Sequence, residues 1–171
     1  TAAFTPAAND LLAVCISASG TVAAGSVTDD QGGTYTKITS ALKNTSADTL
    51  YLFVRDTLVE AAVSTIVTFS CAGDAGTGAC IDVLRVTGMG KTGAAAIVRS
   101  AIQQNQASGT PAPAFSGAAS TGNPTIGFVG NGASPAALTA PTSWTERADA
   151  GTATPTRGQE TVSRNSGFTG T

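Results

Sequence analysis

The chain has 171 residues, a net charge of -2 and only 12% charged residues, which fits one domain of ordinary size. So few charges argue against a nucleic-acid partner, which needs a basic stripe. No apolar run reaches the ~20 residues that span a bilayer, so we expect no membrane partner. The sequence contains no histidine, which excludes His-ligated metal sites and Ser-His-Asp or Cys-His catalysis within this chain. We expect no cofactor.

Strand signals recur along the first third of the chain, separated by Gly, Asp, Asn and Ser. The run from Leu11 to Ser17 is apolar on both faces, which predicts a central strand. Residues 27–29 and 34–39 flank the turn-forming sequence Asp29-Asp30-Gln31-Gly32-Gly33. We therefore expect these two segments to form a hairpin.

The strongest strand signal is residues 50–55, in which two faces alternate. One face carries Leu50, Leu52 and Val54, and the other carries Tyr51, Phe53 and Arg55. Residues 63–70 also alternate, and residues 79–87 form an apolar strand that contains Asp82 and Arg85. These two charged side chains point to opposite faces, so we expect at least one of them to lie near an edge or to find a partner.

The second half of the chain is more polar and richer in Ala and Pro. Residues 91–104 contain helix formers without a helix start, and we favour extended structure there. Residues 103–122 predict a long polar surface loop. Three further strands are expected at residues 125–130, 144–149 and 159–164.

Eight to ten short strands predict an all-β fold, a two-sheet antiparallel sandwich with jelly-roll-like topology and long polar loops. We expect one domain over residues 1–171. Ser166 to Thr171 resembles the start of another strand, so a final strand of the sandwich is expected to be missing. The many Ala and Gly residues suit closely spaced sheets, but burial at ~25 cal/mol per Å² yields little energy from such a thin core. We therefore expect additional stabilisation from contacts between subunits or from packing against a larger assembly.

The three cysteines leave two interpretations open. Cys71 and Cys80 flank a Gly-rich loop, and they would lie opposite each other in a disulfide if their segments formed a hairpin. The alternative is that all three remain reduced and act as small apolar residues. Cys15 lies within the first apolar run, which predicts that it is buried.

No sequence motif gives a strong signal for a catalytic, metal-binding or modification site. Residues 88–92 contain Gly-Lys-Thr, but Arg85 stands where a phosphate-binding loop needs glycine, so a simple turn is expected. Asp29 and Asp30 lack the spacing of a calcium-binding loop. Asn44-Thr45-Ser46 is a formal glycosylation triplet. Asp82 is the one acid inside a strongly apolar strand, where we expect it to face outward or to pair with Arg85 or Arg55.

Tyr35, Tyr51 and Trp144 are the candidate ligand-binding or interface aromatics. Rings with a polar edge suit a half-exposed sugar-stacking platform. The alternative is that these scattered rings anchor the core or a subunit interface.

Three stretches resemble structural proteins of tailed bacteriophages. They are Phe4-Thr5-Pro6-Ala7-Ala8-Asn9-Asp10-Leu11-Leu12, residues 105–115, and a final stretch that begins Pro141-Thr142-Ser143-Trp144-Thr145-Glu146-Arg147-Ala148-Asp149 and continues through residues 154–158 and 163–168. The resemblance implies a component of the virion surface. It assigns no functional residue.

The first functional hypothesis is a non-enzymatic virion structural protein. It would be a capsid decoration (cement) or tail-associated protein whose partners are the major capsid or tail protein and copies of itself. The alternative is a β-sandwich module of a phage or bacterial adhesin that binds a carbohydrate or a cell surface, with a host glycan as partner. A third hypothesis, a hydrolase that uses Asp82, needs a second acid across a cleft.

Overall fold

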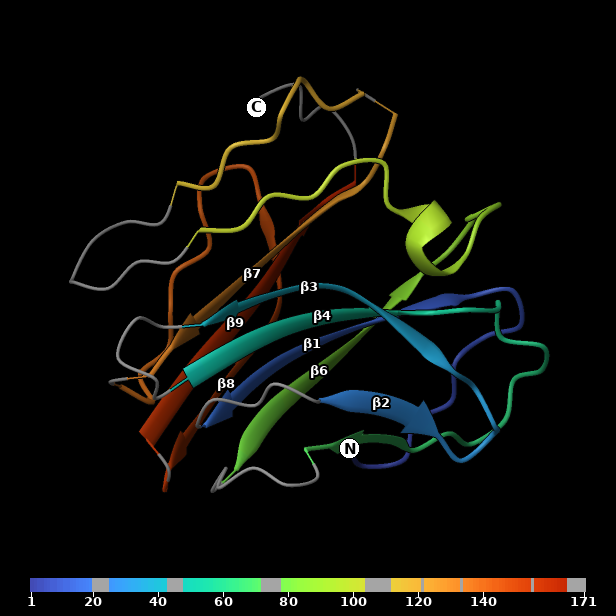
Figure 1. Cartoon of the computed structure of the whole chain (residues 1–171), viewed down its shortest axis with the longest axis horizontal. Coiled ribbons are helices and arrows are strands. Elements are labelled where there is room, and N and C mark those ends of the chain that lie inside the picture. The colour runs from blue at the N-terminus through green and yellow to red at the C-terminus, as the bar shows by residue number, and fades with distance from the viewer. Residues whose placement is uncertain are drawn as a thin grey trace.

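The computed structural model describes residues 1–19, 25–42, 48–71, 78–103, 112–120, 122–132, 134–154 and 156–165 (Figure 1). These residues form strands and one short 3-10 turn, η1 (Gly93–Ala96). The strands are β1 (Leu11–Ser19), β2 (Ser26–Asp29), β3 (Tyr35–Leu42), β4 (Asp48–Arg55), β5 (Val67–Ser70), β6 (Ala79–Val86), β7 (Thr125–Asn131), β8 (Thr145–Ala153) and β9 (Thr156–Arg164). The all-β prediction is confirmed.

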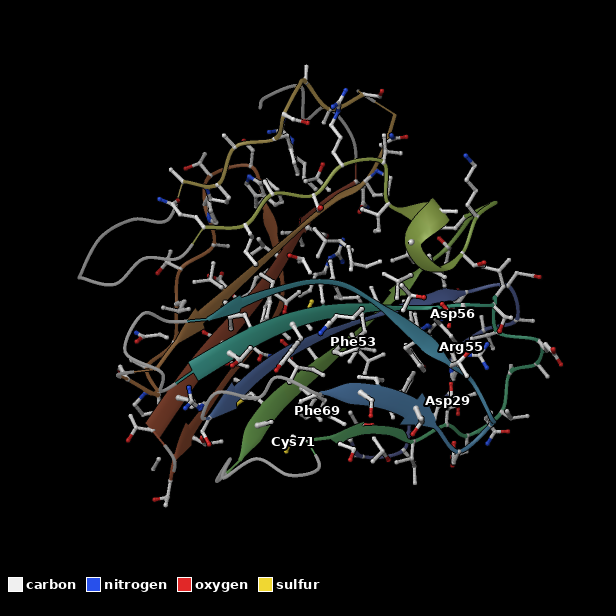
Figure 2. All side chains as sticks on the ribbon, in the orientation of Figure 1. Asp29, Phe53, Arg55, Asp56, Phe69 and Cys71 are labelled. Atoms are coloured by element: carbon white, nitrogen blue, oxygen red, sulfur yellow. The ribbon has the colours of Figure 1, made fainter. Side chains whose placement is uncertain are left out.

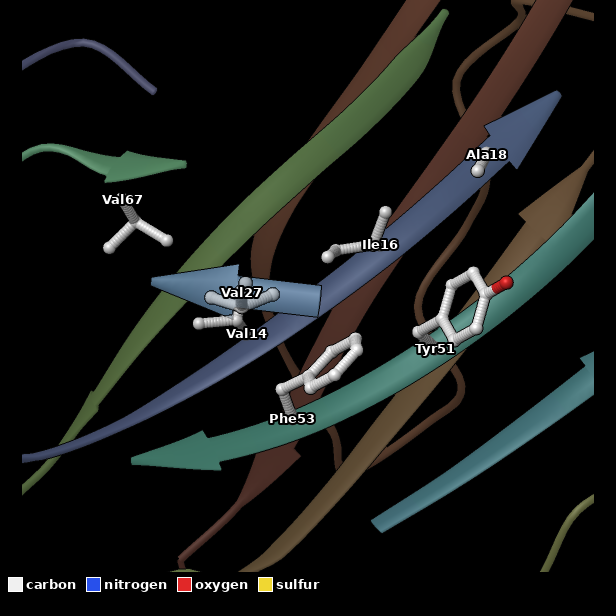
Figure 3. Close-up of a cluster of buried hydrophobic side chains, with 7 residues drawn as sticks. All are labelled: Val14, Ile16, Ala18, Val27, Tyr51, Phe53 and Val67. Carbon is white, nitrogen blue, oxygen red and sulfur yellow. The ribbon is translucent and has the colours of Figure 1, made fainter. Parts of the chain in front are cut away.

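Every strand pairing is antiparallel, and the described strands form three hydrogen-bonded sheets. The largest has the order β3-β4-β1-β6, and the others are β2-β5 and β7-β9-β8. The four-stranded sheet lies in the middle, with β2 in front of it and β9 behind it in the view of Figure 3. The predicted layering of antiparallel sheets is present, although the strands are divided among three sheets and their order does not show a jelly roll.

Strand β1 is central, as its apolar sequence predicted. All nine of its residues are buried, because layers cover both faces of the sheet. Val14 and Ile16 face the β2-β5 layer, while Cys15 and Ser17 face the three-stranded sheet. The alternation predicted for β4 is also confirmed, because Tyr51 and Phe53 lie on the face of Val14.

The main core lies between the central sheet and the β2-β5 ribbon (Figure 3). The ring of Tyr51 lies 5.7 Å, between centroids, from both Phe53 and Phe69. Fully burying a large apolar side chain contributes roughly 1.5–3 kcal/mol, so these residues hold the ribbon on the sheet. The buried members of the cluster are Val14, Ile16, Ala18, Val27, Tyr51, Phe53 and Val67.

The opposite face of the central sheet packs closely against β7. A Cβ atom added at Gly130 of β7 would overlap the side chain of Leu50 and would lie 3.1 Å from the Oγ atom of Ser17. Glycine therefore lets β7 approach the central sheet. Leu11, Ala13 and Val54 form the buried apolar part of this interface, with Ile126 of β7 packed against them.

The predicted hairpin of β2 with β3 is wrong. A single bridge joins Thr28 to Thr34, after which β2 pairs with β5 and β3 pairs with β4. The reason is that Val27 of β2 and Val67 of β5 cover the Tyr51 face of the central sheet. The chain between the two strands therefore turns from one layer to the next.

Several segments also differ from the sequence-based prediction. The strand expected over 63–70 is limited to Val67–Ser70, with Thr65 in an isolated bridge to Phe4. Residues 91–103 contain no strand, and they form the 3-10 turn at Gly93–Ala96 and a bend at Val98. The expected strands at the end of the chain are present as β8 and β9, and both are longer than predicted.

Candidate functional site

A groove of about 510 Å³ runs beside β6, the edge strand of the central sheet. Its floor is formed by five consecutive residues, Ile81 to Arg85. Side chains alternate between the two faces of a strand, so a groove that touches every one of these residues follows the edge of the strand. No other described strand pairs with this edge.

One wall of the groove is the segment Thr1–Thr5. Its Phe4 exchanges two backbone hydrogen bonds with Thr65, at 3.0 and 2.8 Å between nitrogen and oxygen. The ring of Phe4 packs against the main core. The segment is therefore fixed beside the β2-β5 layer.

The other wall is formed by Arg147 and Ala148 of β8. The pairing of β8 with β9 shifts register between Glu146 and Ala148, which is the signature of a β-bulge. The Nε atom of Arg147 donates a hydrogen bond to the Oγ atom of Ser163, 2.6 Å away, and its Nη2 atom donates a hydrogen bond to the Oδ1 atom of Asn165. The bulge and these bonds fix the exposed guanidinium of Arg147 at the rim.

The charged side chains around the groove differ in how far they are exposed to solvent. The Arg85 side chain is 47% exposed and its Nε atom lies 2.7 Å from Oδ2 of Asp10, whose carboxylate is buried. Asp82 is also buried, and its Oδ2 atom accepts a hydrogen bond of 2.7 Å from the hydroxyl of Thr161. The exposed charged side chains that line the groove are thus those of Arg85 and Arg147.

The partner of Asp82 differs from the prediction. Sequence reasoning expected an outward-facing carboxylate or a bond to Arg85 or Arg55, but the bond goes to Thr161 in another sheet. Arg85 pairs with Asp10 and Arg55 pairs with Asp29.

Cys15 lies opposite Asp82 in the pairing of β1 with β6. Burial and, to a lesser extent, the nearby Asp82 carboxylate raise the pKa of the Cys15 thiol to about 12, although a hydrogen bond with Thr161 acts in the opposite direction. At neutral pH this cysteine is therefore a protonated, fully buried thiol, and its role is packing.

The structure does not bring the three predicted aromatics together. Tyr51 is 2% exposed within the main core. Tyr35 packs against the same core and donates its hydroxyl to Asp29. Trp144 lies near Gly127 of β7, in a different layer. A sugar-stacking platform of these rings is therefore not formed.

Of the two interpretations of the cysteines, the bridge between Cys71 and Cys80 is not formed, and all three cysteines are free. The hairpin that such a bridge required does not form, because β5 pairs with β2 whereas β6 pairs with β1. Cys71 packs against the main core, shown near Phe69 in Figure 2. Cys80 is hydrogen-bonded to Thr152 of β8 on the other side of the central sheet.

Asp29 organises the turn after β2, as the sequence predicted for this acidic stretch. Its Oδ1 atom accepts backbone hydrogen bonds from Gln31 and Gly33, at 3.0 and 2.7 Å. Its Oδ2 atom accepts from Arg55 at 2.9 Å and from Tyr35 at 3.0 Å. Burial alone would raise the pKa of this carboxyl, but these bonds and the guanidinium charge lower it below its ordinary value.

Three acids gather on the outer face of the three-stranded sheet. Asp149 pairs with Glu160 across β8 and β9, and the bulge brings Glu146 to the same face. Burial, and the charges of Glu146 and Asp149, raise the pKa of Glu160. In the described part of the chain, no group of three or more acidic or cysteine side chains has the geometry to hold a metal ion.

The other predicted features lie in connections. Residues 88–92 form an irregular turn in which Gly88 has a φ of 72°, so the Gly-Lys-Thr sequence does not lead into an α-helix. The Asn44-Thr45-Ser46 triplet lies outside the described residues, as do residues 104–111 of the predicted polar loop.

Two apolar side chains stand out on the connection between β6 and β7. Val98 is 72% exposed and Ile102 is 47% exposed. This segment lies beside residues 112–120, because Arg99 contacts both Ser116 and Gly117. Figure 1 shows the connection passing over the β3 and β7 side of the sheets.

Sequence reasoning missed the groove, because edge position depends on the order of strands in the sheet. The only hint was Arg85, whose charge in an apolar strand predicted an edge or a partner. No local pattern marked the bulge that carries Arg147.

Comparisons of the chain with protein-family models, with curated proteins and with solved structures find no match. None of the helical segments among the described residues has the length and apolarity needed to cross a membrane.

Proposed function

We propose that this chain is a non-enzymatic structural protein of a tailed-bacteriophage particle, a capsid decoration or tail-associated protein. It covers or stabilises the particle surface through contacts with the major capsid or tail protein and with copies of itself. The three stretches of resemblance support this proposal, and so does a layered fold with an apolar segment outside its sheets.

The observation that carries the proposal is the exposure of Val98 and Ile102 on the connection between β6 and β7. Both side chains belong to an irregular segment that lies outside the strands. Large apolar side chains that are exposed on one segment offer a surface for contact with another subunit.

The energetics suit a repeating particle. Burying each of these side chains against a neighbour contributes roughly 1.5–3 kcal/mol. A contact of that size is weak for a single copy. On a particle, however, each copy sits beside several subunits, and simultaneous contacts strengthen one another through a high effective concentration.

Mass spectrometry of purified particles tests the proposal. Particles from cells that carry the gene are expected to contain this chain in many copies, and its absence from them would end the proposal.

A matched pair of variants then tests the contact surface. Val98→Asp is expected to weaken binding of the chain to particles that lack it, by about tenfold or more. Val63→Asp is the control, because Val63 is also exposed, at 41%, but lies before β5. Equal binding by the two variants would contradict the role of Val98.

A further inference from the structure

The outer edge of β6 is not paired with any other strand in the described part of the chain. In an antiparallel sheet, alternate residues of an edge strand direct their N–H and C=O groups away from the sheet. No backbone hydrogen bond outside the sheet pairings involves Ile81–Arg85 among the described residues. Such an edge is a template for another strand.

The edge is also recessed, which restricts what can reach it. Thr1–Thr5 flanks it on the side of the β2-β5 layer, and Arg147 and Ala148 flank it on the side of β8. A second folded copy approaching edge to edge needs more room between these flanks than a single strand does. A single extended segment fits between them, because its backbone needs only the ~4.8 Å spacing of neighbouring strands.

The dimensions match a short peptide. Five residues of extended chain span ~17 Å, the length of the Ile81–Arg85 floor. The volume of about 510 Å³ falls within the ~300–1,000 Å³ that binding sites commonly occupy.

The exposed charges specify the chemistry of the occupant. Arg147 lines the groove with an exposed guanidinium group, Arg85 is exposed but paired with Asp10, and Asp82 is buried and bonded to Thr161. Guanidinium groups bind carboxylates in bidentate geometry. An acidic residue on the incoming strand is therefore favoured, and a basic one is repelled.

We infer that the groove binds an extended acidic segment of a partner protein, which adds to the outer edge of β6 as a fifth strand of the central sheet. Backbone bonds to β6 supply the affinity, and contact of an Asp or Glu side chain with Arg147 supplies the selectivity. This inference does not depend on a virion role for the chain.

The experiment is a selection from a random library of eight-residue peptides on the purified, immobilised chain. Enriched peptides are expected to be acidic and to carry β-branched residues at alternating positions. When a synthetic version of an enriched peptide binds the chain, hydrogen exchange is expected to slow at backbone amides within Ile81–Arg85. Adding salt is expected to weaken the binding.

Arg147→Glu is the decisive variant and is expected to weaken binding about tenfold or more. Arg99→Glu is its control, because Arg99 is an exposed arginine on the connection that carries Val98. The affinity of this variant for the peptide is expected to stay within about twofold of that of the unchanged chain. A thermal melt like that of the unchanged chain separates lost binding from lost folding. The inference is overturned if no acidic peptide is enriched, if exchange slows elsewhere than in β6, or if Arg147→Glu binds as tightly as Arg99→Glu.

Discussion

The Nε atom of Arg55 lies 2.9 Å from the Oδ2 atom of Asp29, and this contact joins the last residue of β4 to the last residue of β2 in a different sheet. Both side chains are buried, at 8% and 1% exposure. The contact fixes the point at which the chain passes from the β2-β5 ribbon into the central sheet, at one end of the layers in Figure 2.

Asp29→Asn is expected to lower the free energy of unfolding by about 3–5 kcal/mol, because it leaves a buried guanidinium without its charge partner. Urea unfolding at pH 7 measures the loss. Asp30→Asn is the control on the next residue, whose carboxylate accepts a surface bond from Ile66, and its expected loss is about 1 kcal/mol. Equal losses for the two variants would contradict the role of the Asp29–Arg55 pair.

The two perturbed carboxyls shift stability in opposite directions with pH. The folded pKa of Asp29 is lowered, so its stabilising contribution is present above its ordinary value of 3.8 and is lost as pH falls through the folded value. The folded pKa of Glu160 is raised above its ordinary value of 4.5. Its contribution is therefore present below 4.5 and is lost as pH rises through the folded value.

Glu160→Gln is accordingly expected to stabilise the fold at pH 7, because it removes the cost of a buried carboxylate near Glu146 and Asp149. The advantage is expected to disappear below pH 4, where Glu160 is protonated in both folded and unfolded chains. Urea unfolding at the two pH values measures it. A difference between variant and unchanged chain that is the same at both pH values would contradict this account.

Thr161→Val is expected to cost about 1–3 kcal/mol of unfolding free energy, because it removes the hydroxyl that donates to the buried Asp82 carboxylate. Valine preserves the shape of the side chain, so the loss reports the hydrogen bond. Thr161→Ser keeps the hydroxyl and is expected to lose less. A larger loss for serine than for valine would show that packing of the methyl group, not the bond, joins these layers.

The cysteines are expected to differ in reactivity. Alkylation of the native chain at pH 8, followed by peptide mass mapping, should modify Cys71 first, because it is the most exposed of the three. Cys15 should react only after unfolding, since it is fully buried and its pKa is about 12. A native chain in which Cys71 and Cys80 resist alkylation until a reductant is added would contradict the free thiols.

Local patterns predicted the interior of the fold and failed where distant segments meet. The alternation of Leu52 and Phe53 predicted both faces of β4, because side-chain direction follows from a strand's own period. The Asp82–Thr161 and Arg85–Asp10 bonds join residues 79 and 75 positions apart. No local pattern encodes such pairings, since they depend on which sheet each strand enters.

The same limit explains why the hairpin prediction was wrong and why the Cys71–Cys80 bridge, one of two interpretations, is absent. Both assumed that neighbours in sequence pair in space, which holds for β8 and β9. Here the β2-β5 ribbon is formed by segments about 40 residues apart, because each supplies a valine to the same apolar face. The candidate site follows from that topology, since β8 and the segment Thr1–Thr5, which is held beside the ribbon, define the walls beside β6.

Electron cryomicroscopy of particles purified from cells that make this chain tests the central claim, that it functions by subunit contact, most directly. The account predicts density for the three layers on the particle exterior, with Val98 and Ile102 buried against a neighbouring subunit. Particles without that density, or a bound chain whose Val98 and Ile102 still face solvent, would contradict it.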